Sequence, residues 1–478
     1  MTFQLNPTIS LIFLGSLALV TIGLILLLSK KHKNNLDNFL VSGRNIGGTT
    51  GALSVAVTWV WAPALLVSSQ QAFEKGLPGA FWFIIPNALA LILIGTLISK
   101  LKKRMPKGFT LPQFIKENLG KKNHILYISI ILLVQIYSII IHLTAILLIL
   151  SPLLNISKTS IMIILAMIFL LLASIRGIRS SFFSDWVKFI FIFIIILFIV
   201  PLTIYLSGGL SSVLGGIGGT SGKFTNIFDW SVFLTFGIAI SISLLSGATI
   251  DQQLWQRAFS IKEGKEKKAF YIGAILFFLI PLLLSSLGFI AANKTLNLPI
   301  LNSQLAGYSV ILNYLPDVLI LIFISSLMIS LFAAGASALC AASSVFTIDI
   351  YSTYINSKAS EKKKLLVGRS SMILILLLGM MIAFIPNIQI VYLVLLIGSI
   401  RGALLIPTIV AIYKEKVSSK YFFMSSVLGI LFGLPLFILG TIIKNPILSS
   451  IGALLSVGVS SIIILISLKL KNHSDKNG

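Results

Sequence analysis

The chain has 478 residues, of which 57% are hydrophobic and only 10% are charged, and its mean hydropathy is +1.03. A soluble domain carries about 25% charged residues, so this composition excludes a soluble globular protein and predicts a chain surrounded mostly by lipid. The net charge of +24 comes from short Lys and Arg clusters between apolar runs, so it indicates membrane topology and not nucleic-acid binding.

Several other kinds of site are absent from the sequence. Cys340 is the single cysteine, so no disulfide within the chain is possible, and no Cys/His cluster predicts a metal. No Walker sequence is present, which argues against ATP-driven transport, and no nucleophile motif suggests an enzyme. We therefore expect no catalytic residue, no cofactor, no metal site and no required protein partner. The opening residues lack the basic region of a cleaved signal peptide, so the first apolar run is expected to remain as a span.

Long apolar runs follow one another along the whole chain. A transmembrane helix needs about 20 apolar residues, and about thirteen runs qualify, most of them separated by Lys, Pro, Gly or Asn. In chain order they lie near 8–29, 46–73, 78–99, 124–151, 157–175, 182–206, 229–251, 268–292, 317–346, 364–385, 389–413, 420–443 and 447–468. The predicted fold class is an all-α polytopic membrane protein.

Basic residues alternate between the two sides of these predicted spans. One set of loops carries clusters at 30–44, 100–107, 176–179, 257–268, 358–364, 414–420 and 469–476. The opposite set carries only single lysines, namely Lys75, Lys158, Lys223, Lys294 and Lys444. Because positively charged loops stay in the cytoplasm, we predict a multi-pass protein of the inner (plasma) membrane, with its N-terminus outside and its C-terminus in the cytoplasm.

Two of the predicted spans contain residues that interrupt a helix. The second holds Trp59, Trp61 and Pro63 among several glycines, and the seventh holds Gly247 and ends at Asp251. They lie five spans apart, so a repeat of that length runs in opposite directions across the bilayer. Matched broken helices in inverted repeats mark the central site of many transporters. For either span alone, the alternative is a kinked helix whose small residues permit close packing.

Ionisable residues inside a span are costly, and four of those in the predicted spans are candidates for a structural or functional role. Asp185 and Lys188 are three residues apart and form a structural ion pair on one helix face, unless Asp185 is an ion-site carboxylate facing the bundle. His142 is a hydrogen-bonded structural residue or a proton relay. Arg401 lines an aqueous path or anchors a neighbouring helix, and the sequence does not separate these two roles.

Four motifs, in order, resemble those of the sodium:solute symporter family, from Phe39 to about Tyr413. They are FLVSGRNIGG (39–48), RGIRSSFFSDWVKF (176–189), DQQLWQRAFSIKEGKEKKA (251–269) and SSVFTIDIY (343–351). The resemblance implies secondary active transport and a five-plus-five inverted repeat (LeuT-like) fold. The expected division is an extra span and loop at 1–45, repeats at 46–206 and 229–413, and two further spans with a tail at 414–478.

The resemblance also implies a sodium site, and this sequence departs from it. Backbone carbonyls are expected from Val57, Val60 and Ser330, with Asp185 as a supporting carboxylate. The family's two adjacent hydroxyls fall on positions occupied by alanines, Ala333 and Ala334. A weaker sodium site, coupling to protons, and uncoupled flow are the three alternatives that follow.

Within the family, the urea–proton symporter branch is most similar around WAPALLVSSQQAFEKGLPGAFWF (61–83) and KLKKRMPKGFTL (100–111). We therefore expect ion-coupled import of urea or a similar nitrogenous solute, driven by sodium or protons. A sodium-coupled symporter of proline-like amino acids or other organic solutes is one alternative, and an uncoupled channel is another. The expected solute-binding residues are Trp59, Trp61, Trp82, Asp251, Gln252 and Gln253.

Overall fold

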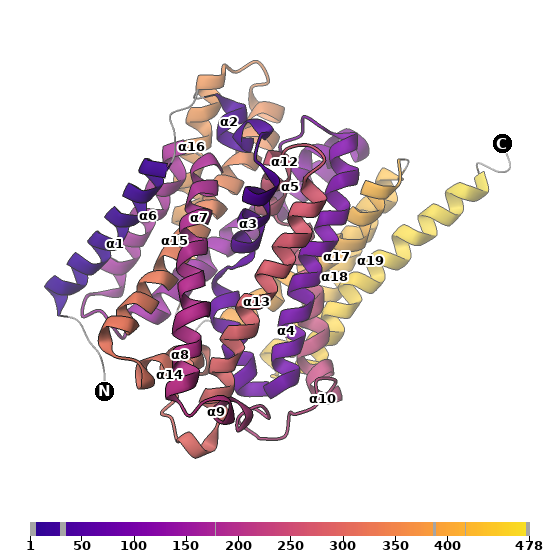
Figure 1. Cartoon of the computed structure of the whole chain (residues 1–478). Coiled ribbons are helices and arrows are strands. Elements are labelled where there is room, and N and C mark those ends of the chain that lie inside the picture. The colour runs from indigo at the N-terminus through magenta and orange to yellow at the C-terminus, as the bar shows by residue number, and fades with distance from the viewer. Residues whose placement is uncertain (1–5, 29–34, 177, 386–388, 416, 475–478) are drawn as a thin grey trace.

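The computed structural model describes residues 6–28, 35–176, 178–385, 389–415 and 417–474. Over these residues the regular structure is helical, and the helices run side by side as one bundle (Figure 1). Parts of four predicted basic loops, at 30–34, 177, 416 and 475–476, lie outside the described residues. In Figure 1, α1 (Pro7–Leu28) and α19 (Pro446–Ser474) flank the bundle on its two sides.

Ten helical segments among the described residues are long and apolar enough to cross a membrane. They are Ala62–Arg104, Leu111–Leu150, Ser181–Leu206, Trp230–Thr249, Glu266–Ala292, Asp317–Ile355, Glu361–Ala383, Ile390–Tyr413, Ser419–Ile442 and Pro446–Leu470. Two more apolar stretches, Pro7–Gly23 and Lys158–Ser174, are shorter. The predicted count of about thirteen spans is therefore not confirmed, although a multi-pass helical protein is.

The predicted second and third spans are separated by a turn, which divides the segment 62–104 into two helical arms. Residues 62–104 form α4 (Ala62–Arg104), which turns at Gly76, where φ is +56°. A Cβ at this position would lie 2.5 Å from the carbonyl oxygens of Ile217 and Phe224, and both oxygens accept a hydrogen bond from the amide of Leu77. Glycine is required here both for the backbone conformation and for the close approach of the 217–224 loop.

Two short helices precede the first break, and the long α4 follows it. After α2 (Leu36–Val41), α3 (Gly48–Trp59) ends at Val60, and α4 restarts with Pro63 in its first turn. Proline is favoured there because its missing N–H has no partner to lose. α5 (Leu111–Leu150), α6 (Lys158–Arg176), α7 (Ile178–Ile194) and α8 (Val200–Leu206) follow.

The seventh predicted span is also interrupted. α10 (Trp230–Val232) passes through a π-helical turn, Phe233–Gly237, into α11 (Ile238–Thr249). The chain then leaves the helix at Ile250 and Asp251 and starts again as α12 (Gln252–Ser260). α13 (Glu266–Ala292), α14 (Ala306–Tyr314), α15 (Asp317–Val345), a π-helix at Phe346–Ile355, α16 (Glu361–Ala383), α17 (Ile390–Tyr413) and α18 (Ser419–Ile442) complete the bundle.

Most of the basic loops gather at one end of the bundle, here called the basic end. Arg44 donates to the carbonyls of residues 106–108, and Arg104 donates to those of Ala411 and Ile412. Lys102 pairs with Glu266 at 2.5 Å. These cations bind carbonyls at helix ends, where such charges are favoured. The opposite end contains Gly76 and the 209–224 loop with α9 (Leu210–Leu214) (Figure 1).

Candidate functional site

A small cavity lies inside the bundle beside the two helix breaks. Its volume is about 20 Å³, which is room for about one water molecule. Residues from α3, α4, α5, α12, α15 and α17 surround it. The lining comprises Thr58, Trp59, Trp61, Val134, Tyr137, Ser138, His142, Asp251, Gln253, Ala334 and Arg401. The cavity therefore joins both broken helices to three continuous ones.

The first break places two indole rings on the cavity. Trp59 is the last residue of α3 and Trp61 precedes the first turn of α4, with Val60 between them at φ −79° and ψ 78°. The two rings stack with centroids 5.6 Å apart and planes 30° apart. Both rings are less than one-tenth exposed. The interruption of the helix therefore places two buried, stacked indole rings along one side of the cavity.

The second break places a carboxylate on the same cavity. Asp251 is the N-cap of α12, and its Oδ1 accepts the Gln253 amide at 2.9 Å and the Gln135 Nε2 at 3.1 Å. Gln253 in turn donates from Nε2 to the Ser138 hydroxyl at 3.3 Å. Since Gln135 and Ser138 belong to α5, these bonds attach the start of α12 to α5.

Arg401 reaches the cavity from α17. Its side chain is buried, its Nη2 donates to the Ser243 carbonyl at 3.3 Å, and its guanidinium lies 5.9 Å from the Tyr137 ring centroid. Within the described part of the chain, no carboxylate lies within the 4.0 Å ion-pair limit of Arg401. A Cβ on Gly247 would be 3.3 Å from Arg401 Nη2 and from Trp59, so the glycine leaves room for both side chains.

Buried polar atoms without a hydrogen-bond partner concentrate at this cavity. Five of its lining residues carry one, namely Trp59 (Nε1), Trp61 (Nε1), Tyr137 (Oη), His142 (Nε2) and Arg401 (Nε). His142 already donates from Nδ1 to the Ser138 carbonyl, so a neutral imidazole presents Nε2 as an acceptor. Native proteins rarely leave buried polar atoms unsatisfied. A bound polar molecule is the simplest partner for such a group of atoms.

Asp185 and Lys188 on α7 are not paired with each other, and the predicted ion pair along one helix face is wrong. Asp185 pairs with Arg257 at 3.1 Å and accepts a short hydrogen bond from Ser54. Lys188 instead donates from Nζ to the carbonyl oxygen of Val60, at 2.5 Å, in the break between α3 and α4. Arg257 reaches Asp185 from α12, and Lys188 binds the backbone of the break instead.

With the exception of Ala334, the structure places the remaining predicted residues away from the cavity. Trp82 packs on Phe233 with ring centroids 4.8 Å apart. Gln252 binds the backbone of Phe109 and Leu111 and the Ser344 hydroxyl. The other predicted ion-site residues surround the first break and α15. Of these, Ala334 lines the cavity, whereas Val57, Val60, Asp185, Ser330 and Ala333 are buried outside its lining.

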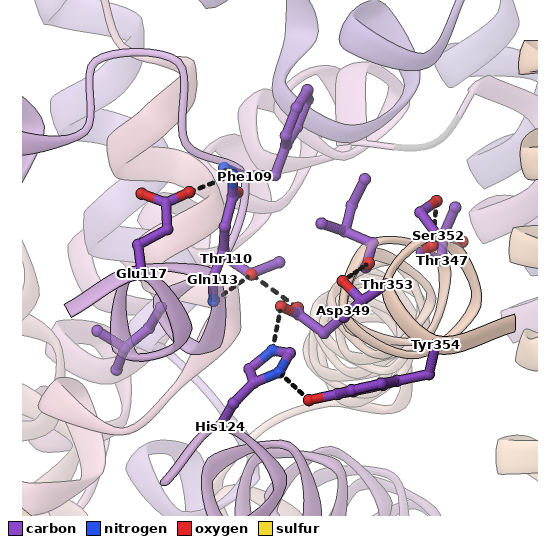
Figure 2. Close-up of polar contacts among 12 residues, drawn as sticks. Phe109, Thr110, Gln113, Glu117, His124, Thr347, Asp349, Ser352, Thr353 and Tyr354 are labelled. Carbon is purple, nitrogen blue, oxygen red and sulfur yellow. Dashed lines mark hydrogen bonds and ion pairs between the residues drawn. The ribbon is translucent and has the colours of Figure 1, made fainter. Parts of the chain in front are cut away.

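Sequence reasoning missed a second buried polar cluster, at the basic end. Figure 2 shows His124 of α5 between Asp349 and Tyr354 of the π-helix that follows α15. His124 Nε2 lies 2.9 Å from an Asp349 oxygen and Nδ1 lies 2.7 Å from the Tyr354 hydroxyl. Thr110 donates to the other Asp349 oxygen at 2.7 Å (Figure 2). The signal that could have indicated this cluster is the position of His124 and Asp349, two ionisable residues near the ends of predicted spans.

The opposite end of the bundle is hollow. A cavity of about 730 Å³ is lined by polar residues of α4 and by residues of α11, α17 and α18, among them Gln70, Gln71, Glu74, Lys75, Phe236 and Tyr392. At the basic end, backbone hydrogen bonds between Ile46 and the end of α12 join the segment before α3 to α12, and the His124 cluster joins α5 to the chain after α15. The protein is therefore closed at its basic end and hollowed at the other.

Comparison with known proteins agrees with this architecture. The sequence model of the sodium:solute symporter family matches residues 39–429. The urea-proton symporter DUR3 of Oryza sativa subsp. japonica is 23% identical over 372 residues, covering 70% of this chain and 50% of the relative. The urea active transporter of Saccharomyces cerevisiae is 25% identical over 389 residues, covering 74% of this chain and 51% of the relative. The chain thus spans about half the length of these two relatives.

Solved structures share the fold at lower sequence identity. A Na⁺-coupled sialic acid symporter in a substrate-bound, outward-open state superposes with a TM-score of 0.78 at 16% identity, covering 96% of this chain and 97% of the other. The nucleobase-cation symporter Mhp1 gives a TM-score of 0.57 at 12% identity, covering 92% and 96%. These likenesses establish the fold and say nothing about the solute.

Proposed function

Because the chain belongs to the sodium:solute symporter family, we propose that it is a secondary active symporter that imports a small polar solute across the plasma membrane. Solute binds at the cavity between the two broken helices, which must widen from its present volume of about 20 Å³ to admit it. A coupling ion, sodium or proton, supplies the driving force. The partners of this activity are the solute, the ion and the lipid bilayer.

The observation that carries this proposal is the group of unpartnered buried atoms around one cavity. Two indole N–H groups and the Arg401 Nε are donors, and the Tyr137 hydroxyl and His142 Nε2 add acceptor capacity. Flat aromatic walls with a few convergent polar groups suit a small planar solute. A neutral amide such as urea presents a carbonyl acceptor and N–H donors that match this set.

We assign the two repeats to residues 46–206 and 229–413. The breaks at 60–61 and 250–251 support this assignment, because each repeat then contributes its broken helix to the cavity. Alternating access follows when one repeat-derived bundle rocks against the other around the site. With the basic end in the cytoplasm, the hollow opposite end corresponds to an outward-facing arrangement.

A second candidate solute is an amino acid or another small carboxylate. Arg401 favours it, because a buried guanidinium without an ion pair matches the fork geometry of a carboxylate. Asp251 lines the same cavity and would receive the ammonium group of a zwitterion. An uncoupled channel would need a continuous polar passage, whereas the basic end is closed by buried contacts.

The test is uptake of labelled solute into proteoliposomes under imposed sodium or proton gradients. Urea, proline and other small nitrogenous solutes are compared. We expect saturable, gradient-driven accumulation of one of them. The loss of the indole donor in Trp59→Phe should raise the half-saturation concentration by about threefold to tenfold, the equivalent of one hydrogen bond of roughly 0.5–1.5 kcal/mol.

Trp82→Phe is the matched control, because the Trp82 Nε1 is also buried without a partner but lies outside the cavity. Its half-saturation concentration should stay at the parent value. Flux that rises linearly with concentration and ignores both gradients would identify a channel. Equal effects of Trp59→Phe and Trp82→Phe on the half-saturation concentration would contradict the proposal that solute binds at the cavity.

A further inference from the structure

The break between α3 and α4 holds a cation that belongs to the protein itself. The Lys188 side chain is about 1% exposed and is among the largest fully buried side chains of the described residues. Its Nζ donates to the Val60 carbonyl at 2.5 Å. This is one of the carbonyls that the family resemblance assigns to a sodium ion, so an ammonium group already satisfies it.

Several of the oxygen atoms that would hold sodium at this place are absent or already bonded. Ala333 and Ala334 of α15 are buried methyl side chains and offer no oxygen in place of the family's two hydroxyls. The Val57 carbonyl accepts the Val60 amide at 3.2 Å, and the Val60 carbonyl accepts Lys188. Binding of a desolvated cation at a broken helix depends on several converging oxygens, so these changes weaken a sodium site at the break.

The charge balance around the break also disfavours a second cation. Asp185 is the carboxylate of this region, and Arg257 pairs with it at 3.1 Å. Lys188 adds one further positive charge, so these three side chains together carry a net charge of +1 before any ion arrives. An isolated charge in a buried site is costly. A sodium ion would therefore enter a region that is already positive and whose carboxylate, Asp185, is already paired with Arg257.

We propose that the Lys188 ammonium takes the place of the sodium ion at this break. The tethered cation holds α7 to the unwound segment between Trp59 and Trp61, which positions the two indole rings without a bound metal ion. The role of Lys188 in transport rests on the proposed function of the protein. The assignment of the cation position rests on the Lys188–Val60 contact and on the alanines of α15.

The first test needs no solute. The Tm of the purified protein is measured while sodium chloride replaces potassium chloride at constant ionic strength. The parent should show no sodium-specific rise. The triple variant Lys188→Met, Ala333→Ser, Ala334→Thr frees the Val60 carbonyl and restores two hydroxyls, and its Tm should rise by about 2 °C or more with sodium, as for any ligand that binds only the folded state.

Lys102→Met with the same two α15 substitutions is the matched control. Lys102 is also buried and also binds a carbonyl, that of Ile261, but it lies at the basic end beside Glu266. This control should stay indifferent to sodium. A sodium-specific Tm rise in the parent, a folded triple variant without one, or an equal rise in the control would each overturn the proposal.

The second test uses whichever solute the uptake assay identifies. Replacing sodium by potassium on both sides should leave uptake by the parent unchanged and should abolish uptake by the folded triple variant. Parent uptake that vanishes without sodium would contradict the role of Lys188. If no solute accumulates under any gradient while the Tm results hold, the proposed function fails and the assignment of Lys188 stands.

Discussion

At the scale of single residues, Arg401 is the least compensated charge of the cavity. Arg257, on α12, is held by Asp185 and by two serine hydroxyls. Arg401 has a single backbone partner, at 3.3 Å, and its Nε has none. A buried cation with spare donors is stabilised strongly by a ligand that brings acceptors. This contrast makes Arg401 the residue whose replacement should affect solute binding most.

We expect Arg401→Gln to raise the half-saturation concentration for the transported solute by roughly 10- to 150-fold, which corresponds to the about 1.5–3 kcal/mol of a hydrogen bond to a charged group. Arg401→Lys keeps the charge but loses the planar fork, so it should recover part of the affinity for a carboxylate solute and little of it for a neutral amide. Initial uptake rates over a concentration series measure both variants.

Arg369→Gln removes the same group from an exposed position of α16 and should leave the half-saturation concentration unchanged. An unaltered value in Arg401→Gln would show that the guanidinium anchors helices and does not meet the solute. The sequence left these two roles open because it did not show whether a carboxylate reaches Arg401.

Individual residues of the cavity were predictable where a local signal marked them. Trp59, Trp61, Asp251 and Gln253 stand next to helix-breaking positions, and the structure brings these four to one cavity. Tyr137 and Ser138 were missed although they lie one turn from His142, because a hydroxyl in an apolar helix has no distinctive sequence context. The partner of Lys188 was also unpredictable, since the carbonyl of Val60 is free only because α3 ends there.

At the scale of elements, contacts between α5 and the chain after α15 close the basic end. Asp349 is buried and accepts hydrogen bonds from His124 and Thr110 (Figure 2). Tyr354 completes the cluster from the partly exposed side. If solute leaves at this end, these buried contacts must separate during each transport cycle, so their strength sets how often the end opens.

His124→Ala should therefore loosen the π-helix at 346–355. Removing one partner of a buried carboxylate costs about 1–3 kcal/mol, which makes local opening roughly 5- to 150-fold more frequent. Hydrogen–deuterium exchange of peptides covering 346–355 and 111–124 measures this opening. Tyr354→Phe removes only the outer hydrogen bond and keeps Asp349 paired, so its exchange should stay close to that of the parent.

An unchanged exchange rate in His124→Ala would mean that the cluster does not hold the basic end closed. Exchange that is faster throughout the chain would instead indicate global destabilisation. The element boundaries themselves were only partly predictable. The break at Ile250–Asp251 falls at the end of the seventh apolar run. Hydropathy predicts that the span ends there, and it does not show that the chain continues as a second helix, α12.

At the scale of the whole molecule, the family and the helical architecture followed from apolar runs and ordered motifs, which depend on many residues at once. The family model covers residues 39–429, and long apolar helices account for most of the predicted spans. The exact number of spans is not confirmed, because the apolar stretches Pro7–Gly23 and Lys158–Ser174 are shorter than the ten long segments. The turn at Gly76 does fall between the predicted second and third spans.

The orientation of the bundle is the remaining prediction at this scale. Lys362 lies at the basic end, in the first turn of α16, and Lys223 lies in the loop at the opposite end, and both are exposed. In a Cys340→Ala background, Lys223→Cys should react with a membrane-impermeant maleimide in intact cells. Lys362→Cys should react only after the membrane is permeabilised, because positively charged loops stay in the cytoplasm.

The parent protein is the labelling control, since its single cysteine, Cys340, is buried in α15 and should remain unlabelled in both conditions. Labelling of Lys362→Cys in intact cells, with Lys223→Cys protected, would show that the bundle has the opposite orientation in the membrane. The hollow end would then open to the cytoplasm, and the proposed direction of import would have to start from an inward-facing arrangement. The labelling pattern therefore decides which end of the cavity system first meets the solute.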